Sequence, residues 1–288
     1  MTGAIEIVDP GLLSLVQDQG RPGWAHIGVG RSGAADAGAL RLANRLVAND
    51  ERAAGLEVLL GGLRLRAHGD LTVAVTGAPG PVWVDGRPVG RAAVLELPGG
   101  AELRVGSVVA GLRAYVAVRG GVDVPAVLGS RSTDQLAALG PAPLAVGDVL
   151  PVGPPPEGWP LVDVAPVPAW PDRVTLPVAP GPNADWFDDP LVRLCGADEY
   201  RVTPATNRVA VRLDGPVLTR TDTFTGREMP SAALVVGAVQ VPPDGRPVVF
   251  GVDHPVTGGY PVAAVVRRNA HGLLGQLRPG DAVRFVRG

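Results

Sequence analysis

Residues 82–89 read Val-Trp-Val-Asp-Gly-Arg-Pro-Val, and this segment decides the fold class. The dipeptide Asp85-Gly86 lies between two short apolar runs, and Asp-Gly readily supplies the two positive φ angles of a type I′ turn. The segment therefore predicts a tight β-hairpin. A related stretch, Asp-Gly-Arg-Pro-Val, recurs at residues 244–248, so we expect hairpins of short strands in both halves of the chain.

Composition supports a mainly β protein. The chain has 288 residues with 40 glycines and 30 prolines, while aromatic residues make up only 4%. Abundant turn residues between short apolar runs are typical of many brief strands, and the core must be built mainly from Val, Leu and Ala. A second repeat, Gly147-Asp148-Val149 and Gly280-Asp281-Ala282, is a further hint that both halves form small β-barrels with few short helices.

Prolines crowd between residues 150 and 182, most densely at 154–156. Such a stretch is typical of an extended connector, although it could equally be an arm wrapped on the surface. We predict an N-terminal β subdomain over residues 1–109 that contains one helix. A C-terminal barrel subdomain over residues 110–288 would include the Pro-rich connector at 150–182.

The charge balance excludes several functional classes. The net charge of −2 offers no cationic footprint for nucleic acid or an anionic membrane. Every cation is an arginine, so a Walker A lysine, a Schiff-base lysine and a biotin-accepting lysine are all absent.

The single Cys195 cannot form an internal disulfide, and no apolar run reaches membrane-spanning length. We expect a cytoplasmic protein without a zinc site, since the four histidines are scattered.

The most informative polar segment runs from Gln17 to Asp36. It is rich in glycine, and Asp36 stands where a helix N-cap belongs. Backbone donors at a helix N-terminus suit a small anionic or amide ligand. An ordinary surface loop before a capped helix is the alternative interpretation. The candidate catalytic residues here are Asp18 and Asp36, and the candidate substrate-binding residues are Gln17, Arg21, Ser32 and Gly33.

Three further polar clusters interrupt the apolar strands. Their arginines could bind a carboxylate bidentately, and their glycine pairs could bring main-chain donors to a carbonyl. His254 is the best general-base candidate among the histidines. Alternatively, the arginines brace sheet edges and His254 is a satisfied loop residue. The clusters contain Arg119, Gly120, Gly121 and Ser130; then Arg201 and Asn207; then Gln240, His254, Thr257, Gly258, Gly259 and Tyr260.

Together these segments resemble the 5-oxoprolinase C-subunit family, also described as allophanate hydrolase subunit 2 or biotin-dependent carboxyltransferase. The matching blocks are many, lie in order and span nearly the whole chain. They occupy residues 16–23, 32–36, 56–62, 115–125, 127–133, 180–187, 200–203, 237–245, 257–261 and 274–281.

The resemblance implies a cyclophilin-like β architecture and a pseudo-symmetric assembly with a partner, the B-subunit. In oxoprolinase members an A-subunit completes a complex that opens 5-oxo-L-proline to L-glutamate at the expense of ATP. ATP would then be bound by the complex and not by this chain alone. A related module forms the carboxyltransferase part of urea carboxylase, with biotin carried on another domain. A third group antagonises a sporulation-kinase inhibitor, so a non-catalytic regulatory role also stays open.

On the oxoprolinase interpretation, Asp18 or Asp36 would position the nucleophile, and Arg21, Arg119 or Arg201 would hold the substrate carboxylate. One departure from the family stands out. Relatives usually carry Pro-Ser-Glu-Gly where this chain has Pro-Ser-Ala-Ala at residues 230–233. A milder change places Asn207 where many relatives have aspartate.

Overall fold

The computed structural model describes residues 3–159, 161–167, 169–196 and 199–288. The chain forms two compact units. The first comprises Met1–Arg21 and Ser32–Trp170, and the second comprises Pro22–Arg31 and Pro171–Gly288. The chain thus passes from one unit to the other after Arg21, after Arg31 and after Trp170, and residue 109, the predicted boundary, lies inside the first unit.

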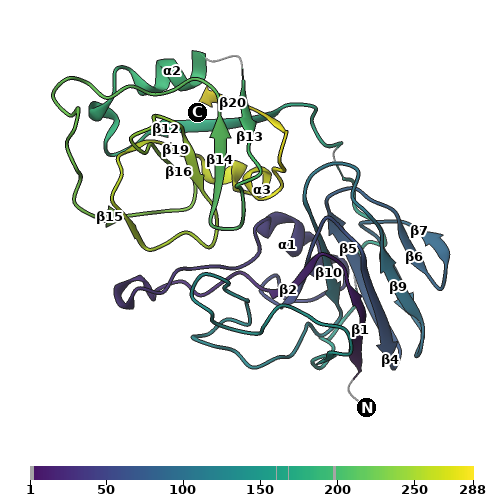
Figure 1. Cartoon of the computed structure of the whole chain (residues 1–288). Coiled ribbons are helices and arrows are strands. Elements are labelled where there is room, and N and C mark those ends of the chain that lie inside the picture. The colour runs from purple at the N-terminus through teal and green to yellow at the C-terminus, as the bar shows by residue number, and fades with distance from the viewer. Residues whose placement is uncertain (1–2, 160, 168, 197–198) are drawn as a thin grey trace. The chain divides into compact units, whose positions relative to one another are not determined.

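The strands of the first unit form two sheets, and every pair of neighbouring strands in them is antiparallel (Figure 1). The predicted hairpin is confirmed, with Asp85 and Gly86 at φ 48° and 75°. The six-stranded sheet has the order β11 (Val149–Pro151), β1 (Ala4–Pro10), β4 (Leu63–His68), β9 (Glu102–Val105), β6 (Val82–Val84) and β7 (Arg87–Val89). The five-stranded sheet has the order β2 (Leu13–Gln17), β3 (Gly55–Leu59), β10 (Arg113–Val118), β5 (Leu71–Gly77) and β8 (Val94–Leu97).

Alternation of side chains places the core of this unit. In β4, Leu63, Leu65 and Ala67 are buried, while the arginines between them are partly exposed, as expected for a strand with one solvated face. All six residues of β10 are buried. Helix α1 (Ala37–Leu46) packs on β10 and β5 and covers the second face of that sheet.

The second unit is built on a closed barrel of seven strands (Figure 1). Strands β12 and β20 pair in parallel, and the other pairs are antiparallel. Around the ring the order is β12 (Val174–Pro180), β19 (Val262–Val266), β16 (Ala238–Gln240), β17 (Val248–Phe250), β14 (Ala210–Asp214), β13 (Tyr200–Val202) and β20 (Ala282–Arg287). A separate two-stranded sheet joins β15 (Ala232–Ala233) to β18 (Thr257–Gly258).

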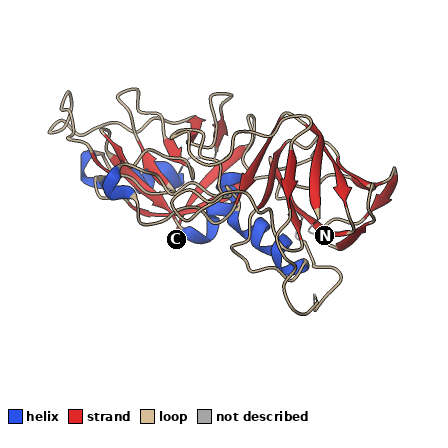
Figure 2. Cartoon of the chain, turned by 90° about the horizontal axis from the view of Figure 1, so that it is seen from below, coloured by secondary structure: helices blue, strands red, loops and turns tan. Residues whose placement is uncertain are grey.

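The prediction of a mainly β protein with few short helices is confirmed (Figure 2). Besides α1, the described residues contain the α-helices α2 (Pro190–Gly196) and α3 (His271–Gly275). They also contain the 3-10 helices η1 (Ala25–Ile27), η2 (Ala184–Trp186) and η3 (Arg268–Ala270). The second unit has the predicted barrel, whereas the first unit is made of two sheets. No helix in the described parts of the chain is long and apolar enough to span a membrane.

Part of the Pro-rich segment lies along a sheet edge. The N–H of Val94 donates to the carbonyl of Asp163, and the N–H of Ala165 donates to that of Ala92, both at 2.8 Å. Ala165 and Val167 also pack on the apolar cluster beneath α1. Residues 163–167 therefore form a surface arm, the alternative to a free connector, and they cover the exposed edge of β8.

Candidate functional site

Asp18 ties two loops of the first unit together from a buried position. Its carboxylate accepts four hydrogen bonds: from the N–H groups of Gly20 (2.7 Å) and Arg131 (2.6 Å), and from the hydroxyls of Ser130 (2.6 Å) and Ser132 (2.5 Å). The structure thus brings Asp18 and Ser130 together, although the sequence placed them in separate clusters. A carboxylate with four donors around it is well suited to hold a loop in one conformation.

Arg21 is equally enclosed. Its guanidinium donates to the carbonyl of Ser132 and lies 3.7 Å from the carboxylate of Asp134, with no exposed side-chain surface. Gly33 has a φ of 97°, and a Cβ there would lie 2.8 Å from the backbone nitrogen of Gly20. Only glycine fits this close approach, so the loop is packed against itself and is not an open surface turn.

Gln17 and Ser32 meet at one carbonyl. The Gln17 amide nitrogen donates to the carbonyl of Thr133 at 2.9 Å, and the Ser32 hydroxyl donates to it at 3.3 Å. All three residues are buried. These polar groups of the predicted first cluster form an interior network of the first unit.

Asp36 is the N-cap of α1, as predicted. One oxygen of its carboxylate accepts from the N–H of Ala39 at 3.0 Å. Its own N–H donates to the hydroxyl of Tyr115 at 2.8 Å. The Tyr115 hydroxyl in turn donates to Glu57 at 2.8 Å, and Glu57 forms an ion pair with Arg113 at 3.2 Å. Asp18 and Asp36 therefore have separate sets of partners.

Tyr115 is the residue of this network that sequence reasoning missed. Burial, and then the adjacent Glu57 carboxylate, raise the pKa of Tyr115 well above its ordinary value. The phenol is therefore a stable hydrogen-bond donor, which is what a buried carboxylate acceptor requires. The signal for a buried polar network was Glu57, a charged residue inside the apolar run 56–60.

Arg119 holds the part of the Pro-rich segment that precedes the surface arm. Its guanidinium donates to the carbonyls of Val47 (3.1 Å), Pro156 (2.7 Å) and Gly158, and it lies 4.7 Å from the centre of the Trp159 ring. The next two N–H groups, those of Gly120 and Gly121, donate within the unit to Asn49 Oδ1 and to the carbonyl of Val118, both at 2.8 Å.

In the second unit, Arg201 and Asn207 make local contacts. Arg201 is exposed and pairs with Glu199 at 2.5 Å. Asn207 accepts the N–H groups of Val209 and Ala210 at 2.8 and 3.2 Å and thereby closes a turn before β14. Such an arrangement is typical of an asparagine side chain in a turn.

His254 is mostly buried beside Phe250, with ring centroids 6.4 Å apart. Its Nδ1 lies 2.7 Å from the carbonyl of Pro255. Because a carbonyl only accepts, Nδ1 carries the proton, and in the neutral ring Nε2 is the acceptor. The preceding residue, Asp253, forms a buried bidentate ion pair with Arg208 at 2.7 and 3.0 Å.

The structure brings together Gln240 and the segment 257–260, which belong to the last of the four predicted clusters. His254, the remaining residue of this fourth cluster, makes no described contact with the others. The Gln240 amide donates to the carbonyl of Tyr260 at 2.7 Å. A Cβ at Gly258 would lie 2.8 Å from the Gln240 amide nitrogen, so Gly258 permits this close approach. Thr257 and Gly258 form β18, and the next two residues, Gly259 and Tyr260, line a pocket of the second unit.

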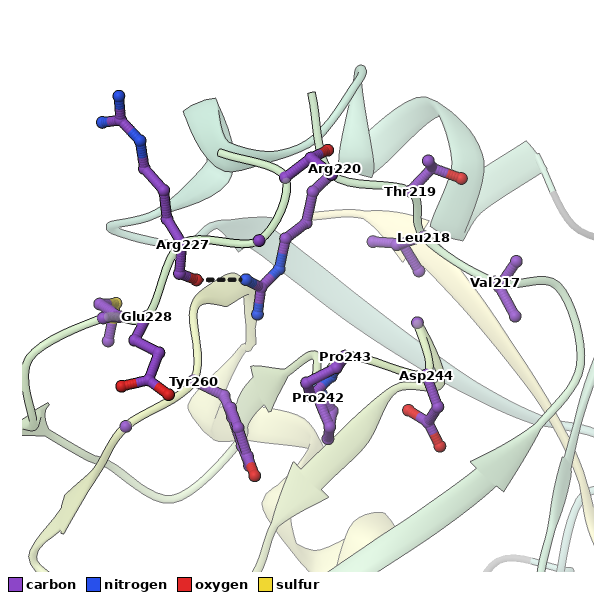
Figure 3. A pocket seen from close by; sticks show the side chains of 15 residues that line it. Val217, Leu218, Thr219, Arg220, Arg227, Glu228, Pro242, Pro243, Asp244 and Tyr260 are labelled. Carbon is purple, nitrogen blue, oxygen red and sulfur yellow. Dashed lines mark hydrogen bonds between the residues drawn. The ribbon is translucent and has the colours of Figure 1, made fainter. Parts of the chain in front are cut away.

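This barrel pocket has a volume of about 910 Å³ and is shown in Figure 3. Its walls come from two loops of the second unit, one between β14 and β15 and one between β16 and β17, and from the segment that follows β18. Cavities of this size hold small-molecule ligands in many proteins. The lining residues are Val217, Leu218, Thr219, Arg220, Thr225, Gly226, Arg227, Glu228, Met229, Pro242, Pro243, Asp244, Gly245, Gly259 and Tyr260.

Arg220 reaches into the barrel pocket (Figure 3). Its Nη1 donates to the carbonyl of Arg227 at 2.7 Å, and the guanidinium lies 5.4 Å from the centre of the Trp186 ring. Its Nε is buried and has no hydrogen-bond partner among the described residues. Among the described residues the hydroxyls of Tyr200 and Thr203 are also buried without a partner, so what sets Arg220 apart is its place in the wall of the pocket.

Sequence reasoning did not single out Arg220. The available signal was the polar run 219–228, which lacks the alternation of a strand.

Residues 27–287 match the family of the carboxyltransferase domain, subdomain A and B. The chain belongs to this family. It is 35% identical to the 5-oxoprolinase C-subunit of Escherichia coli over 286 residues, which covers 98% of this chain and 90% of that protein. It is 33% identical to urea amidolyase of Saccharomyces cerevisiae but spans only 16% of it. The crystal structure of Kluyveromyces lactis urea carboxylase superposes with a TM-score of 0.92 at 32% identity, over 99% of this chain and 27% of that chain.

Ala232 and Ala233, the two alanines of this carboxyltransferase-domain chain that differ from the usual Glu-Gly, form strand β15. Both residues are exposed and pair with Gly258 and Thr257 of β18, directly before the residues of the barrel pocket. A change of side chain at Ala232 or Ala233 therefore adjoins the fourth cluster and leaves the barrel core untouched.

The carboxyltransferase-domain chain offers no metal centre within its described residues, where no group of three or more His, Cys, Asp or Glu side chains gathers. Cys195 is partly buried, and burial raises the pKa of its thiol. A raised pKa keeps the thiol protonated, so Cys195 is unsuited to act as a nucleophile.

Proposed function

We propose that this chain is one component of an ATP-dependent 5-oxoprolinase complex that opens 5-oxo-L-proline to L-glutamate. The observation that carries the proposal is the end-to-end similarity to the Escherichia coli 5-oxoprolinase C-subunit, which covers 98% of this chain and 90% of that protein. The urea amidolyase relative is far longer, since this chain spans only 16% of it.

The proposed chemistry begins with transfer of a phosphoryl group from ATP to the oxygen of the ring amide. A first water adds to the activated carbon and the ring C–N bond breaks, which leaves a glutamyl phosphate. A second water then hydrolyses this acyl phosphate, so that inorganic phosphate leaves and the second carboxylate of glutamate forms. Positioning of the water relative to the ring carbon is the main task for the protein. Because this chain has no lysine, the usual phosphate-binding lysine for ATP would come from a partner protein.

In this proposal Asp18 and Asp36 act by positioning the backbone around them. The contacts of Asp18 favour a role in shaping the loop at Gly20, and those of Asp36 favour a role in starting α1. Arg21, Arg119 and Arg201 are the candidates that the sequence offers for the substrate carboxylate, and Arg220 in the wall of the barrel pocket is a further one. The contacts of the first three arginines to Ser132, Pro156 and Glu199 must be exchanged for that role.

The partners we propose are a B-subunit homologue and, for the full reaction, an A-subunit homologue. The test is co-expression of the three chains, purification of the assembled complex, and measurement of glutamate and phosphate from 5-oxo-L-proline and ATP. We expect both products in equal amounts. An assembled complex that forms neither product contradicts the proposal.

A second candidate is a biotin-dependent carboxyltransferase that acts on urea or a related amide. The observation that favours it is the TM-score of 0.92 to Kluyveromyces lactis urea carboxylase. Biotin would be carried by another domain, because this chain has no lysine to accept it. Urea-dependent loss of carboxylate from carboxybiotin, measured with the assembled complex, would support this candidate, whereas its absence would count against it.

A third candidate is a non-catalytic regulatory partner of the B-subunit, motivated by Ala232 and Ala233. The test introduces Ala232→Glu and Ala233→Gly together and measures turnover in the assembled complex. A large gain would show that the natural chain lacks a catalytic group and would support the regulatory role. Unchanged turnover would mean that the two positions serve only the pairing of β15 with β18.

A further inference from the structure

We infer that Arg220 is the carboxylate-binding residue of the barrel pocket, and that the ligand is a small organic carboxylate that also carries an amide N–H. The identity of the probe used below rests on the proposed function. The inference itself rests on the placement of Arg220, on the charge of the pocket walls and on the volume of the pocket.

The Arg220 guanidinium is fixed before any ligand arrives. Its backbone pairs with that of Phe187, and the N–H of Thr221 donates to the carbonyl of Trp186 at 3.0 Å. The Trp186 ring, itself stacked on Phe224 with centroids 4.4 Å apart, lies against the guanidinium. A cation held by its own backbone and by an aromatic face loses little freedom on binding.

The donors of Arg220 are only partly used within the protein. Among the described residues, Nη1 has one acceptor, the carbonyl of Arg227, and Nε has none. A guanidinium presents its donors as a rigid planar fork that matches the two oxygens of a carboxylate. The guanidinium of Arg220, which lines the pocket, is therefore the group that a ligand carboxylate would bind.

The remaining walls suit the rest of such a ligand. Glu228 and Asp244 place carboxylates on the pocket (Figure 3), and carboxylates accept hydrogen bonds from amide N–H groups. Leu218, Pro242 and the ring of Tyr260 supply apolar surface for a saturated ring. The volume of about 910 Å³ admits a five-membered lactam and leaves room for a second group.

The test titrates the full chain with three probes by calorimetry. 5-Oxo-L-proline has both the carboxylate and the amide N–H, 2-pyrrolidinone lacks the carboxylate, and cyclopentanecarboxylate lacks the amide. We expect 5-oxo-L-proline to bind about tenfold or more tightly than either analogue, the usual loss for one charge-assisted contact. Equal binding of 2-pyrrolidinone would overturn the inference.

Variants locate the contact. Arg220→Gln should weaken binding of 5-oxo-L-proline about tenfold or more, and Arg220→Lys should fall between it and the natural chain. Arg212→Gln, at an exposed position of β14 outside the pocket, should bind as the natural chain does. Unchanged affinity in a folded Arg220→Gln chain contradicts the inference.

A measurement on the natural chain does not depend on how the variants fold. With ¹⁵N-labelled arginine, the Nε–H resonance of Arg220 should shift on addition of 5-oxo-L-proline and stay unchanged with 2-pyrrolidinone. An Nε–H resonance that does not respond to 5-oxo-L-proline overturns the inference.

The two proposals fail separately. If the chain binds 5-oxo-L-proline through Arg220 but the assembled complex does not open it, the pocket assignment stands and the proposed function fails. If the complex opens 5-oxo-L-proline with the same KM after Arg220→Gln, the function stands and the pocket assignment fails.

Discussion

The hydroxyl of Tyr115 donates a 2.8 Å hydrogen bond to the carboxylate of Glu57 and accepts one of the same length from the N–H of Asp36. Both Tyr115 and Glu57 are buried. This contact links the middle of the five-stranded sheet to the first turn of α1. The position of the helix that follows the predicted site loop is therefore set by two strand residues.

Tyr115→Phe should lower the free energy of unfolding by about 1–3 kcal/mol, because it removes one hydrogen bond from the buried Glu57 carboxylate and takes the phenol acceptor away from the N–H of Asp36. Tyr200→Phe is the matched control. Tyr200 is also buried, but its hydroxyl has no hydrogen-bond partner among the described residues. Urea denaturation of the two variants should show a loss for Tyr115→Phe only, and equal losses would contradict this account.

Tyr200 also predicts a dependence of stability on alkaline pH. Burial raises the pKa of Tyr200 to about 12, above its ordinary value of 10. Between these two values the folded state keeps a proton that the unfolded state releases, so the free energy of unfolding should fall as pH rises from about 10 to about 12. Part of that decline should vanish in Tyr200→Phe, as followed by thermal unfolding; an identical decline in both proteins would refute the assignment.

Asp18→Asn separates a structural role of Asp18 from a catalytic one. An amide has one acceptor oxygen and brings two donors of its own, so it cannot accept the four hydrogen bonds that Asp18 receives. The variant should lose about 2–3 kcal/mol of stability. The control is Asp50→Asn, in an exposed turn where the side chain accepts the N–H of Arg52. Full stability with lost activity would instead support a catalytic Asp18.

Asp36→Ala should cost about 1 kcal/mol, since it removes the N-cap of α1, and Asp36→Ser should restore most of that loss. Circular dichroism during thermal unfolding measures both. A serine variant as unstable as the alanine variant would mean that the charge of Asp36, and not its capping oxygen, stabilises the helix.

Arg119→Gln should loosen the Pro-rich segment before and within the surface arm, because it removes the contacts to Pro156, Gly158 and the ring of Trp159. Limited proteolysis should cleave this variant faster within residues 153–167. Arg104→Gln is the control, since Arg104 packs 4.8 Å from the ring of Trp83, outside the arm. Equal cleavage of both variants and the natural chain would show that Arg119 does not hold this segment.

The hairpin at residues 82–89 and the N-cap at Asp36 could be predicted from sequence because each depends on contacts within a few residues. The partners of Asp18 could not, since Ser130 and Ser132 lie more than 100 residues away in the chain. The same holds for the pairing of the Pro-rich arm with β8, where composition allowed both a connector and an arm.

Candidate site residues were predictable only where they share a local segment. The segment 257–260 was found because its threonine, glycines and tyrosine are adjacent in sequence. Arg220 was missed because an arginine in a polar run resembles any solvated cation. Its distinguishing features, the contact with the Trp186 ring and the place in the pocket wall, arise only from tertiary contacts.

The most direct test of the central claim is an omission experiment with 5-oxo-L-proline and ATP. Homologues of the A-subunit and the B-subunit are assayed for glutamate with and without this chain, after light scattering has shown that the three chains assemble. We predict ATP-dependent glutamate formation only when this chain is present. Glutamate formed at the same rate without it, or none formed by the assembled three-chain complex, would contradict the account.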